Sequence, residues 1–404
     1  MLECPIDLEI YQYQIEDKII ALDVQSSSFF TIDQLTSEIL ELADEYLTKD
    51  IIEILDRNYC KEEIKDRLNY LEDLWGKDEI HTFDRFKGSF DSFHTYELKL
   101  HPTSKCNLDC QYCFGDKIHE EKPSEISLKN AKDAVDFLVH QFGPDGQEYK
   151  VDLTGSGEPM LRFDFIKEIK EYCKKLSTEI DKRILVSFCS NGTLLTKENT
   201  SYLKENNILY GVSIDGGQVI NDDLRPYQSG ESSFADVIKN CKQIENRELL
   251  GFAVTLTGEY TNVKDIFLQL SELDLADTIG IKPIRLPHNN KYAINEDNID
   301  EVKEGYNELA LFLLSQSING NTEYFYTLIK GDDYFGKFLK RTIRNHRVIY
   351  RCSAGLNSFS VNAQGDMYNC PAELNNPAFE FGNIYEGVDQ NEQERLKELY
   401  ADNI

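Results

Sequence analysis

The chain has 404 residues, of which 41% are hydrophobic and 28% charged, and its formal net charge is −29. This length predicts two or three domains, and the apolar content is sufficient for substantial cores. The excess of acidic residues argues against nucleic acid as the main partner, because phosphate binding requires a basic face. Two interpretations of the charge stay open: a well-solvated surface and a cationic peptide partner.

The sequence predicts no membrane-spanning segment and no secretion signal, and its cysteine content indicates the redox compartment. It has no stretch of about 18 apolar residues, so it predicts no membrane span. The N-terminus, MLECPIDLEIYQYQ, is acidic and mixed, unlike a signal peptide. Ten cysteines in a chain of this size, without a secretion signal, are typical of a reducing compartment, and we expect a cytoplasmic protein.

Residues 1–80 predict a separate small α+β domain. Alternating apolar residues in LEIYQYQI and KIIALDV predict two strands, and SFFTI predicts a third. Helical patterns follow, and either Thr31 or Asp33 is placed to cap the first helix. The apolar positions that define the first and last of these helices are Leu35, Ile39 and Leu42, and then Ile64, Leu68 and Leu71.

A polar linker at 81–94 leads to an alternation of strands and helices over residues 95–335. Amphipathic helices such as FIKEIKEYCKKL separate six apolar segments. This alternation predicts an α/β fold whose parallel sheet curls into a partial barrel. The expected strands are 96–101, 149–154, 184–189, 209–214, 251–256 and 278–283.

Directly after the first of these strands, Cys106, Cys110 and Cys113 lie in the run HPTSKCNLDCQYCFG. Three thiolates at C-x3-C-x2-C spacing are suited to hold three irons of a cubane 4Fe–4S cluster, and they leave the fourth iron open. The alternatives are three buried structural cysteines or a zinc site. Zinc usually takes four ligands in paired sets, and no such pair follows.

Three more motifs follow in chain order: GSGEP at 155–159, SNGT at 190–193 and SIDG at 213–216. Together with the cysteine run, and with Tyr112 before its last cysteine, they resemble the signatures of radical S-adenosylmethionine (radical SAM) enzymes over roughly residues 95–290. The resemblance implies a partial (β/α)6 barrel, a 4Fe–4S cluster on the three cysteines and S-adenosylmethionine as the second cofactor.

In this family the turn equivalent to GSGEP holds the ammonium of the cofactor, and the resemblance assigns Glu158 as its counter-charge. It also implies that Ser213 contacts the cofactor and that Arg225 binds its carboxylate. The family often has His-Asp-x-x-Arg here, whereas residue 221 is Asn, so Arg225 pairing with Asp222 or Asp223 at the surface is the alternative. No catalytic residue is assigned, and the expected cofactor-binding residues are Tyr112, Gly155, Ser156, Gly157, Glu158, Asn191, Ser213, Asp215 and Arg225.

Residues 336–404 no longer follow the alternation of strands and helices. Cys352, Gly365 and Cys370 form C-x12-G-x4-C around an expected hairpin, SFSVNAQGDMYNC. This pattern resembles the opening half of the SPASM extension, which holds auxiliary 4Fe–4S clusters in peptide-modifying members. The dense run of further cysteines that those members have does not follow before Ile404. Two interpretations stay open: an auxiliary cluster at Cys352 and Cys370, and a hairpin with two ordinary cysteines.

The predicted N-terminal domain, ahead of a radical SAM core, resembles the leader-peptide recognition element of enzymes that modify ribosomally made peptides. That element is a small winged helix-turn-helix, and it binds the precursor's leader as an added strand. An extension that only packs on the barrel is the alternative. A DNA-binding role is disfavoured because the last helix, KEEIKDRLNYLEDLW, is strongly acidic.

These resemblances imply an enzyme that reductively cleaves S-adenosylmethionine to a 5′-deoxyadenosyl radical. The radical would abstract hydrogen from a precursor peptide, with thioether (Cys sulfur to carbon) crosslinks as the expected product. An electron donor such as flavodoxin or ferredoxin is then a partner. The alternatives are protein modification of the anaerobic sulfatase-maturase type and a catalytically inactive peptide-binding partner.

Overall fold

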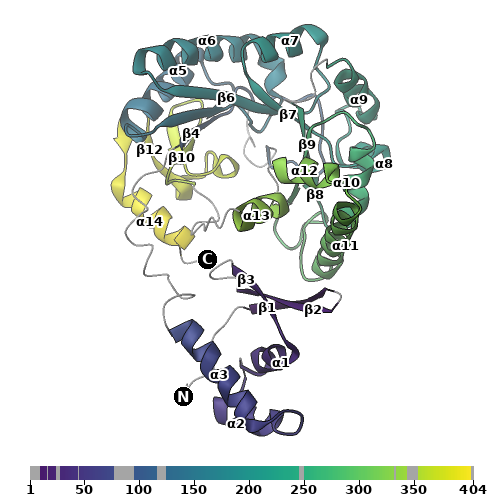
Figure 1. Cartoon of the computed structure of the whole chain (residues 1–404). Helices are drawn as coiled ribbons and strands as arrows, with labels where there is room; N and C mark the ends of the chain where they lie inside the picture. Colours follow the sequence, from purple (N-terminus) through teal and green to yellow (C-terminus); the bar gives the residue numbers. More distant parts are fainter. Residues whose placement is uncertain are drawn as a thin grey trace. The chain divides into compact units, whose positions relative to one another are not determined.

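The computed structural model describes residues 10–15, 17–23, 28–43, 45–76, 95–115, 124–244, 250–331, 334–343 and 354–401. The chain forms two compact units, each with its own hydrophobic core (Figure 1). The N-terminal unit comprises Met1–Ser92 with Arg341–Val348, and the barrel unit comprises Phe93–Lys340 with Ile349–Ile404.

The N-terminal unit contains three antiparallel strands, in the order β1 (Ile10–Ile15), β2 (Lys18–Asp23) and β3 (Ser28–Ile32). Helices α1 (Gln34–Ala43), α2 (Thr48–Leu55) and α3 (Lys61–Gly76) follow. The predicted three strands and the helical pattern are therefore confirmed. The core consists of Ala21, Leu35, Ile39, Leu40, Ile51, Leu55, Ile64 and Leu71.

The barrel unit is built on a ten-stranded sheet. Its central part is parallel, and all six predicted strands are confirmed to within two residues. In sheet order these strands are β4 (Thr95–Leu100), β5 (Glu148–Asp152), β6 (Arg183–Ser190), β7 (Leu209–Ser213), β8 (Leu250–Leu256) and β9 (Thr278–Pro283).

The other four strands come from the C-terminal segment, and this extension of the sheet was not predicted. The expected hairpin forms from β10 (Ser358–Val361) and β11 (Asp366–Tyr368), and β12 (Glu380–Asn383) and β13 (Gly387–Val388) follow. Strand β10 lies parallel to β4, with Ser360 opposite Lys99, and the Asn357 side chain donates a hydrogen bond to the Thr95 carbonyl oxygen at 2.8 Å.

Alternating residues on each parallel strand separate the two faces of the sheet. In β6, Ile184, Val186 and Phe188 belong to the core that the sheet shares with helical residues such as Ile166 and Ile169. Both residues belong to helix α6 (Phe163–Ile180), which lies outside the arc of the sheet (Figure 1). The remaining helices are α5 (Leu128–Phe137), α7 (Lys197–Glu205), α8 (Gln218–Leu224), α9 (Phe234–Lys242), α10 (Val263–Ser271), α11 (Ile299–Ile318), α12 (Glu323–Lys330), α13 (Tyr334–Ile343) and α14 (Gln390–Ala401).

None of the helices in the described part of the chain combines the length and the apolar character needed to cross a bilayer.

Candidate functional site

The four sequence motifs meet at one edge of the parallel sheet. The cysteine run follows β4, and the other three motifs follow or end β5, β6 and β7. The carboxyl ends of parallel strands share an edge, and β/α barrels build their sites there. A backbone hydrogen bond joins two of these segments, since Glu158 N donates to Lys105 O at 2.9 Å. In addition, Asp109 N of the cysteine run donates to Pro226 O, after α8, at 2.8 Å.

The thiols of Cys106, Cys110 and Cys113 are partly buried and lie close enough to influence one another's charge. Burial raises the pKa of the Cys110 thiol to about 12, while the positive charge of Arg225 lowers it. Backbone N–H groups point at two of the sulfurs, from Leu108 to Cys106 Sγ at 3.5 Å and from Gly115 to Cys113 Sγ at 3.4 Å. Such donors favour the thiolate form that binds iron.

This donor set fits an iron–sulfur cluster better than a single metal ion. Among the residues that the structure describes, no group of three or more His, Cys, Asp or Glu side chains is arranged to hold one metal ion. A cubane cluster needs more widely spaced thiolates, because iron and sulfide atoms lie between them. Three soft cysteine ligands on one loop, with backbone N–H donors to two of their sulfurs, are the kind of ligand set that iron–sulfur clusters use.

The GSGEP turn packs against the start of the cysteine loop, and Gly157 is required there. A Cβ atom at Gly157 would lie 2.4 Å from Thr103 O and 2.5 Å from Lys105 O, a distance that no side chain tolerates. Next to it, His101 Nδ1 lies 3.4 Å from Ser156 Oγ. The glycine therefore allows the turn to approach the loop closely.

Glu158 is only 2% exposed, and both of its carboxylate oxygens accept hydrogen bonds. Oε1 accepts from Met160 N at 2.9 Å and from Ser190 Oγ at 2.8 Å, and Oε2 accepts from Asn191 N at 2.7 Å. Burial raises the pKa of this carboxyl, and these hydrogen bonds lower it. The side chain thus joins the GSGEP turn to the end of β6, and its predicted contact with the cofactor's ammonium stays a prediction.

Asn191 belongs to a second network around the first cysteine. Its Nδ2 donates to Asn107 Oδ1 at 2.8 Å and points toward Cys106 Sγ at 3.8 Å. Asn107 Nδ2 in turn donates to Thr193 Oγ1 at 2.8 Å. The sequence analysis did not single out Asn107 as a site residue. Its position directly after Cys106 was the one local signal of a larger role.

Tyr112, Asp215 and Arg225 form a triad beside the cysteine loop, in which Tyr112 is partly buried and the other two residues are buried. The Tyr112 hydroxyl donates to Asp215 Oδ2 at 2.5 Å and accepts from Arg225 Nη1 at 2.6 Å. Arg225 Nη1 lies 3.6 Å from Asp215 Oδ2. Arg225 is 8% exposed, so the alternative of a surface ion pair with Asp222 or Asp223 is wrong.

Two residues that sequence reasoning missed support this triad. Asn221 stands where the family often has His, and its Oδ1 accepts from Asp215 N at 3.3 Å. Asn221 Nδ2 donates to Ser233 Oγ at 3.2 Å, and that hydroxyl donates to Arg225 O at 2.6 Å. The departure at residue 221 was the signal that could have drawn attention to this position.

Ser213 ends β7, and its hydroxyl oxygen lies 3.1 Å from Cys189 Sγ on β6. Gly155 is held close to His101, which a Cβ atom would approach to 3.0 Å. The structure therefore brings all nine predicted cofactor-binding residues to the edge that carries the cysteine loop. Their contacts with S-adenosylmethionine stay predictions.

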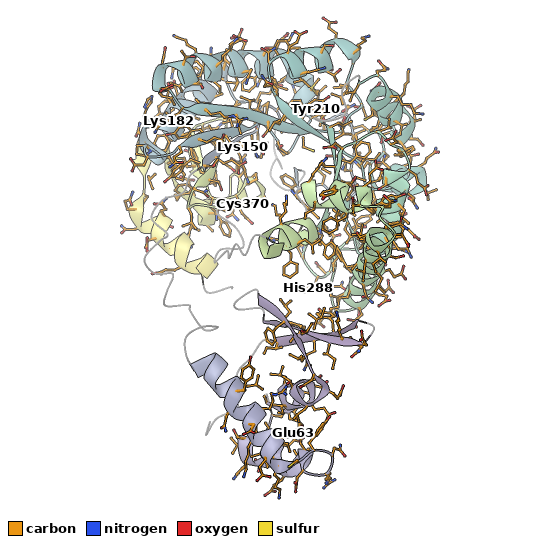
Figure 2. All side chains as sticks on the ribbon, viewed as in Figure 1. Glu63, Lys150, Lys182, Tyr210, His288 and Cys370 are labelled. Atoms are coloured by element: carbon orange, nitrogen blue, oxygen red, sulfur yellow. The ribbon has the colours of Figure 1, made fainter. Side chains whose placement is uncertain are left out.

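The predicted auxiliary site is only half described. Cys370 follows β11 and is labelled in Figure 2, whereas Cys352 lies outside the described residues. An auxiliary cluster at Cys352 and Cys370 therefore stays a prediction.

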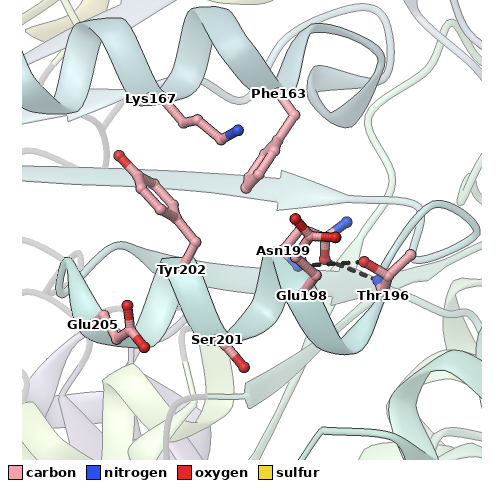
Figure 3. A pocket seen from close by; sticks show the side chains of 8 residues that line it. All are labelled: Phe163, Lys167, Thr196, Glu198, Asn199, Ser201, Tyr202 and Glu205. Atoms are coloured by element: carbon pink, nitrogen blue, oxygen red, sulfur yellow. Dashed lines mark hydrogen bonds between the residues drawn. The ribbon is translucent and has the colours of Figure 1, made fainter.

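A surface pocket between α6 and α7 is separate from this edge (Figure 3). The rings of Phe163 and Tyr202 meet edge to face with centroids 5.7 Å apart, and Lys167 Nζ lies 4.7 Å from the Phe163 centroid. None of the predicted site residues lines it. The lining residues are Phe163, Lys167, Thr196, Glu198, Asn199, Ser201, Tyr202 and Glu205.

Comparison with known proteins agrees with the site geometry. Residues 100–267 match the model of the radical SAM superfamily. Residues 100–267, which contain all four motifs, therefore belong to the radical SAM superfamily. The chain is 27% identical, over 69% of its length and 70% of the relative, to a serine-type anaerobic sulfatase-maturating enzyme of Bacteroides thetaiotaomicron.

Solved structures share the fold at low sequence identity. The structure of native anSMEcpe with bound AdoMet superposes with a TM-score of 0.61 at 20% identity, covering 74% of this chain and 80% of that one. The Streptococcus suis SuiB structure bound to precursor peptide SuiA superposes with a TM-score of 0.53 at 12% identity, covering 96% and 89%. At 20% and 12% identity, these likenesses show a shared fold.

Proposed function

We propose that this radical SAM enzyme modifies a ribosomally made precursor peptide and forms thioether crosslinks from Cys sulfur to carbon. The observation that carries the proposal is the convergence of the cysteine loop with the GSGEP, SNGT and SIDG segments at one sheet edge. When bound, the 4Fe–4S cluster and S-adenosylmethionine supply one-electron reductive cleavage and a radical that abstracts hydrogen.

The chain's own residues bind and orient these groups. Cys106, Cys110 and Cys113 hold the cluster, and Asn191 directs an amide N–H toward the Cys106 sulfur. Ser156 and Ser213 lie at the adjoining strand ends, and in this proposal they bind polar groups of the cofactor. The protein supplies positioning and exclusion of water, since the radical chemistry belongs to the cofactors.

We further propose a domain organisation with leader recognition by residues 1–80, a linker at 81–94, the radical SAM core at 95–335 and a partial SPASM-like extension at 336–404. The N-terminal sheet has the edge strands that strand addition requires, because β1 and β3 each pair on one side only within this sheet. Tyr11 and Tyr13 on β1 are 58% and 54% exposed. The SuiB structure, which contains a precursor peptide, covers nearly the whole chain and supports this assignment.

The second candidate is modification of a folded protein. It is favoured by the 27% identity to a serine-type anaerobic sulfatase-maturating enzyme. The two candidates differ in substrate: a short precursor needs a leader to be recognised, whereas a folded protein does not.

The test is anaerobic reconstitution of the full chain, followed by iron and sulfide analysis and by an assay for 5′-deoxyadenosine with S-adenosylmethionine and dithionite. We expect about four irons, or about eight if Cys370 contributes to an auxiliary cluster. A Cys106→Ala/Cys110→Ala/Cys113→Ala variant should lose four irons and all cleavage. If the wild type shows no iron-dependent cleavage, the enzyme proposal is wrong and a peptide-binding protein is left.

A further inference from the structure

The triad of Tyr112, Asp215 and Arg225 places a permanent positive charge beside the cysteine loop. Arg225 is 8% exposed and Asp215 is 1% exposed, so both charges are withdrawn from water. The Tyr112 hydroxyl, which comes from the cysteine loop itself, lies between them and is hydrogen bonded to both. The triad thus connects the loop to the end of β7 and to the segment after α8.

A buried ion pair is an expensive way to stabilise a fold. Removing two charges from water costs several kcal/mol per ion, and well-packed apolar residues are often as stabilising or more so. In this triad, moreover, the guanidinium and the carboxylate are separated by 3.6 Å, so the pair is not in close bidentate contact. The arrangement is therefore better explained by what the charges act on than by their attraction to each other.

The nearest group on which these charges can act is the proposed iron–sulfur cluster. The backbone next to Cys110 is bonded to the backbone next to Arg225, since Gln111 N donates to Leu224 O at 2.9 Å. Tyr112, whose hydroxyl is hydrogen bonded to both charged side chains, is the second residue after Cys110. A cluster that accepts an electron gains negative charge, and its reduction potential depends on nearby charge and hydrogen bonds. A cation beside Cys110 favours the reduced cluster, and an anion there disfavours it.

We propose that Arg225 is a positioning residue for the iron–sulfur cluster: Tyr112 and Asp215 hold its guanidinium beside Cys110, where it raises the reduction potential of the cluster and helps to retain it. The inference rests on the proposed cluster site. It is separate from the predicted contact between Arg225 and the carboxylate of the cofactor, because a guanidinium has five N–H donors and only one Nη1 contact is used by Tyr112.

The experiment measures the midpoint potential of the reconstituted full chain by EPR-monitored redox titration, without S-adenosylmethionine, so that any contact with the cofactor is excluded. We expect Arg225→Gln to lower the potential and Asp215→Asn to raise it. The double variant should lie close to the wild type, because the two lost charges have opposite signs. Arg225→Lys keeps the charge and should stay nearer to the wild-type potential than Arg225→Gln.

A second readout is the rate at which a chelator removes iron from the oxidised protein. We expect about tenfold faster loss in Arg225→Gln, within the range found when outer-shell partners of metal ligands are removed. Tyr112→Phe should also lose iron faster, and its potential should lie between those of the wild type and Arg225→Gln, because both charges remain but only Asp215 then holds the guanidinium. Arg183→Gln is the matched control, since Arg183 forms a surface pair with Glu148 at 3.2 Å and its side chain is 70% exposed.

The outcomes separate this inference from the proposed function. If the wild type takes up no cluster, the proposed function fails first. If the wild type holds its cluster but Arg225→Gln keeps the wild-type potential, or if Arg225→Gln and Asp215→Asn shift it in the same direction, the inference is overturned and the triad only stabilises the fold. Should Arg225→Gln fail to fold, the Asp215→Asn and Arg225→Lys potentials still decide the question.

Discussion

Individual residues around the cysteine loop are held by hydrogen bonds that reach across strand ends. Glu158 is the clearest case, because its two oxygens accept from Met160, Ser190 and Asn191 and it has almost no contact with water. Leaving a buried donor without its acceptor costs more free energy than forming a typical hydrogen bond contributes to stability. The carboxylate therefore organises the edge on which the predicted cofactor contacts depend.

Glu158→Gln tests this role. The amide keeps the size of the side chain but replaces one acceptor oxygen with an N–H₂ group, which faces donors on the protein. We expect the free energy of unfolding of the iron-free chain to fall by about 1–3 kcal/mol, measured by urea unfolding. Glu205→Gln, at the exposed end of α7, is the control and should change it little. Equal stabilities for the two variants would contradict the prediction.

Gly157→Ala tests the close approach of the GSGEP turn to the cysteine loop. The added Cβ atom would meet the backbone oxygens of Thr103 and Lys105, so the loop must move. Such overpacking costs typically about 1–3 kcal/mol, and here the displaced segment carries the cluster ligands. We expect a marked loss of iron after reconstitution.

Gly211→Ala on β7 is the matched control, because its Cβ atom would meet nothing closer than Gly251 O at 3.4 Å. Iron uptake should be normal in that variant. The prediction fails if Gly157→Ala binds as much iron as the control does.

Among the elements, helix α1 shows how one capping residue fixes the position at which a helix begins. Asp33 precedes the helix, and its Oδ1 accepts from Thr36 N at 2.9 Å, from Thr36 Oγ1 at 2.6 Å and from Arg67 Nη1 of α3 at 2.6 Å. Desolvation opposes ionisation of this carboxyl, but the hydrogen bonds prevail and lower its pKa to about 2. Of the two caps considered from the sequence, Asp33 is the one confirmed.

The lowered pKa gives a pH-dependent prediction for α1. The stabilising contribution of the Asp33 carboxylate is complete above its unfolded pKa of 3.8 and is lost as the pH falls toward 2. The side chain is 54% exposed, so solvent screens the charge and we expect Asp33→Asn to cost only about 0.5 kcal/mol at pH 7. Hydrogen exchange of the α1 amides would measure this cost, and a difference that persists unchanged at pH 2 would contradict it.

At the scale of the whole molecule, the two units have separate cores and are proposed to have separate tasks. The barrel unit contains every predicted cluster and cofactor residue in the described part of the chain, and the N-terminal unit contains the edge strands proposed for the leader. The net charge of −29 permits a cationic partner, and a well-solvated surface is the other interpretation of this charge.

A chain that lacks residues 1–92 tests this division. We expect it to take up iron and to cleave S-adenosylmethionine in the absence of peptide as the full chain does. Binding of a fluorescent synthetic precursor peptide should fall at least about tenfold, because the proposed strand-addition site is gone. Unchanged precursor binding would remove leader recognition from the N-terminal unit and leave the barrel enzyme intact.

The sequence by itself determined the three N-terminal strands, the six parallel strands of the barrel unit, the order of the motifs and the three cysteines, because apolar alternation and ligand spacing are local properties. Tertiary structure decided what those residues do to one another. The bonds between Tyr112 and its partners join residues 103 and 113 positions apart, and β10 joins β4 from the far end of the chain. No local pattern encodes such pairs, since they form only when parallel strands bring their carboxyl ends to one edge and place Arg225 beside the cysteine loop.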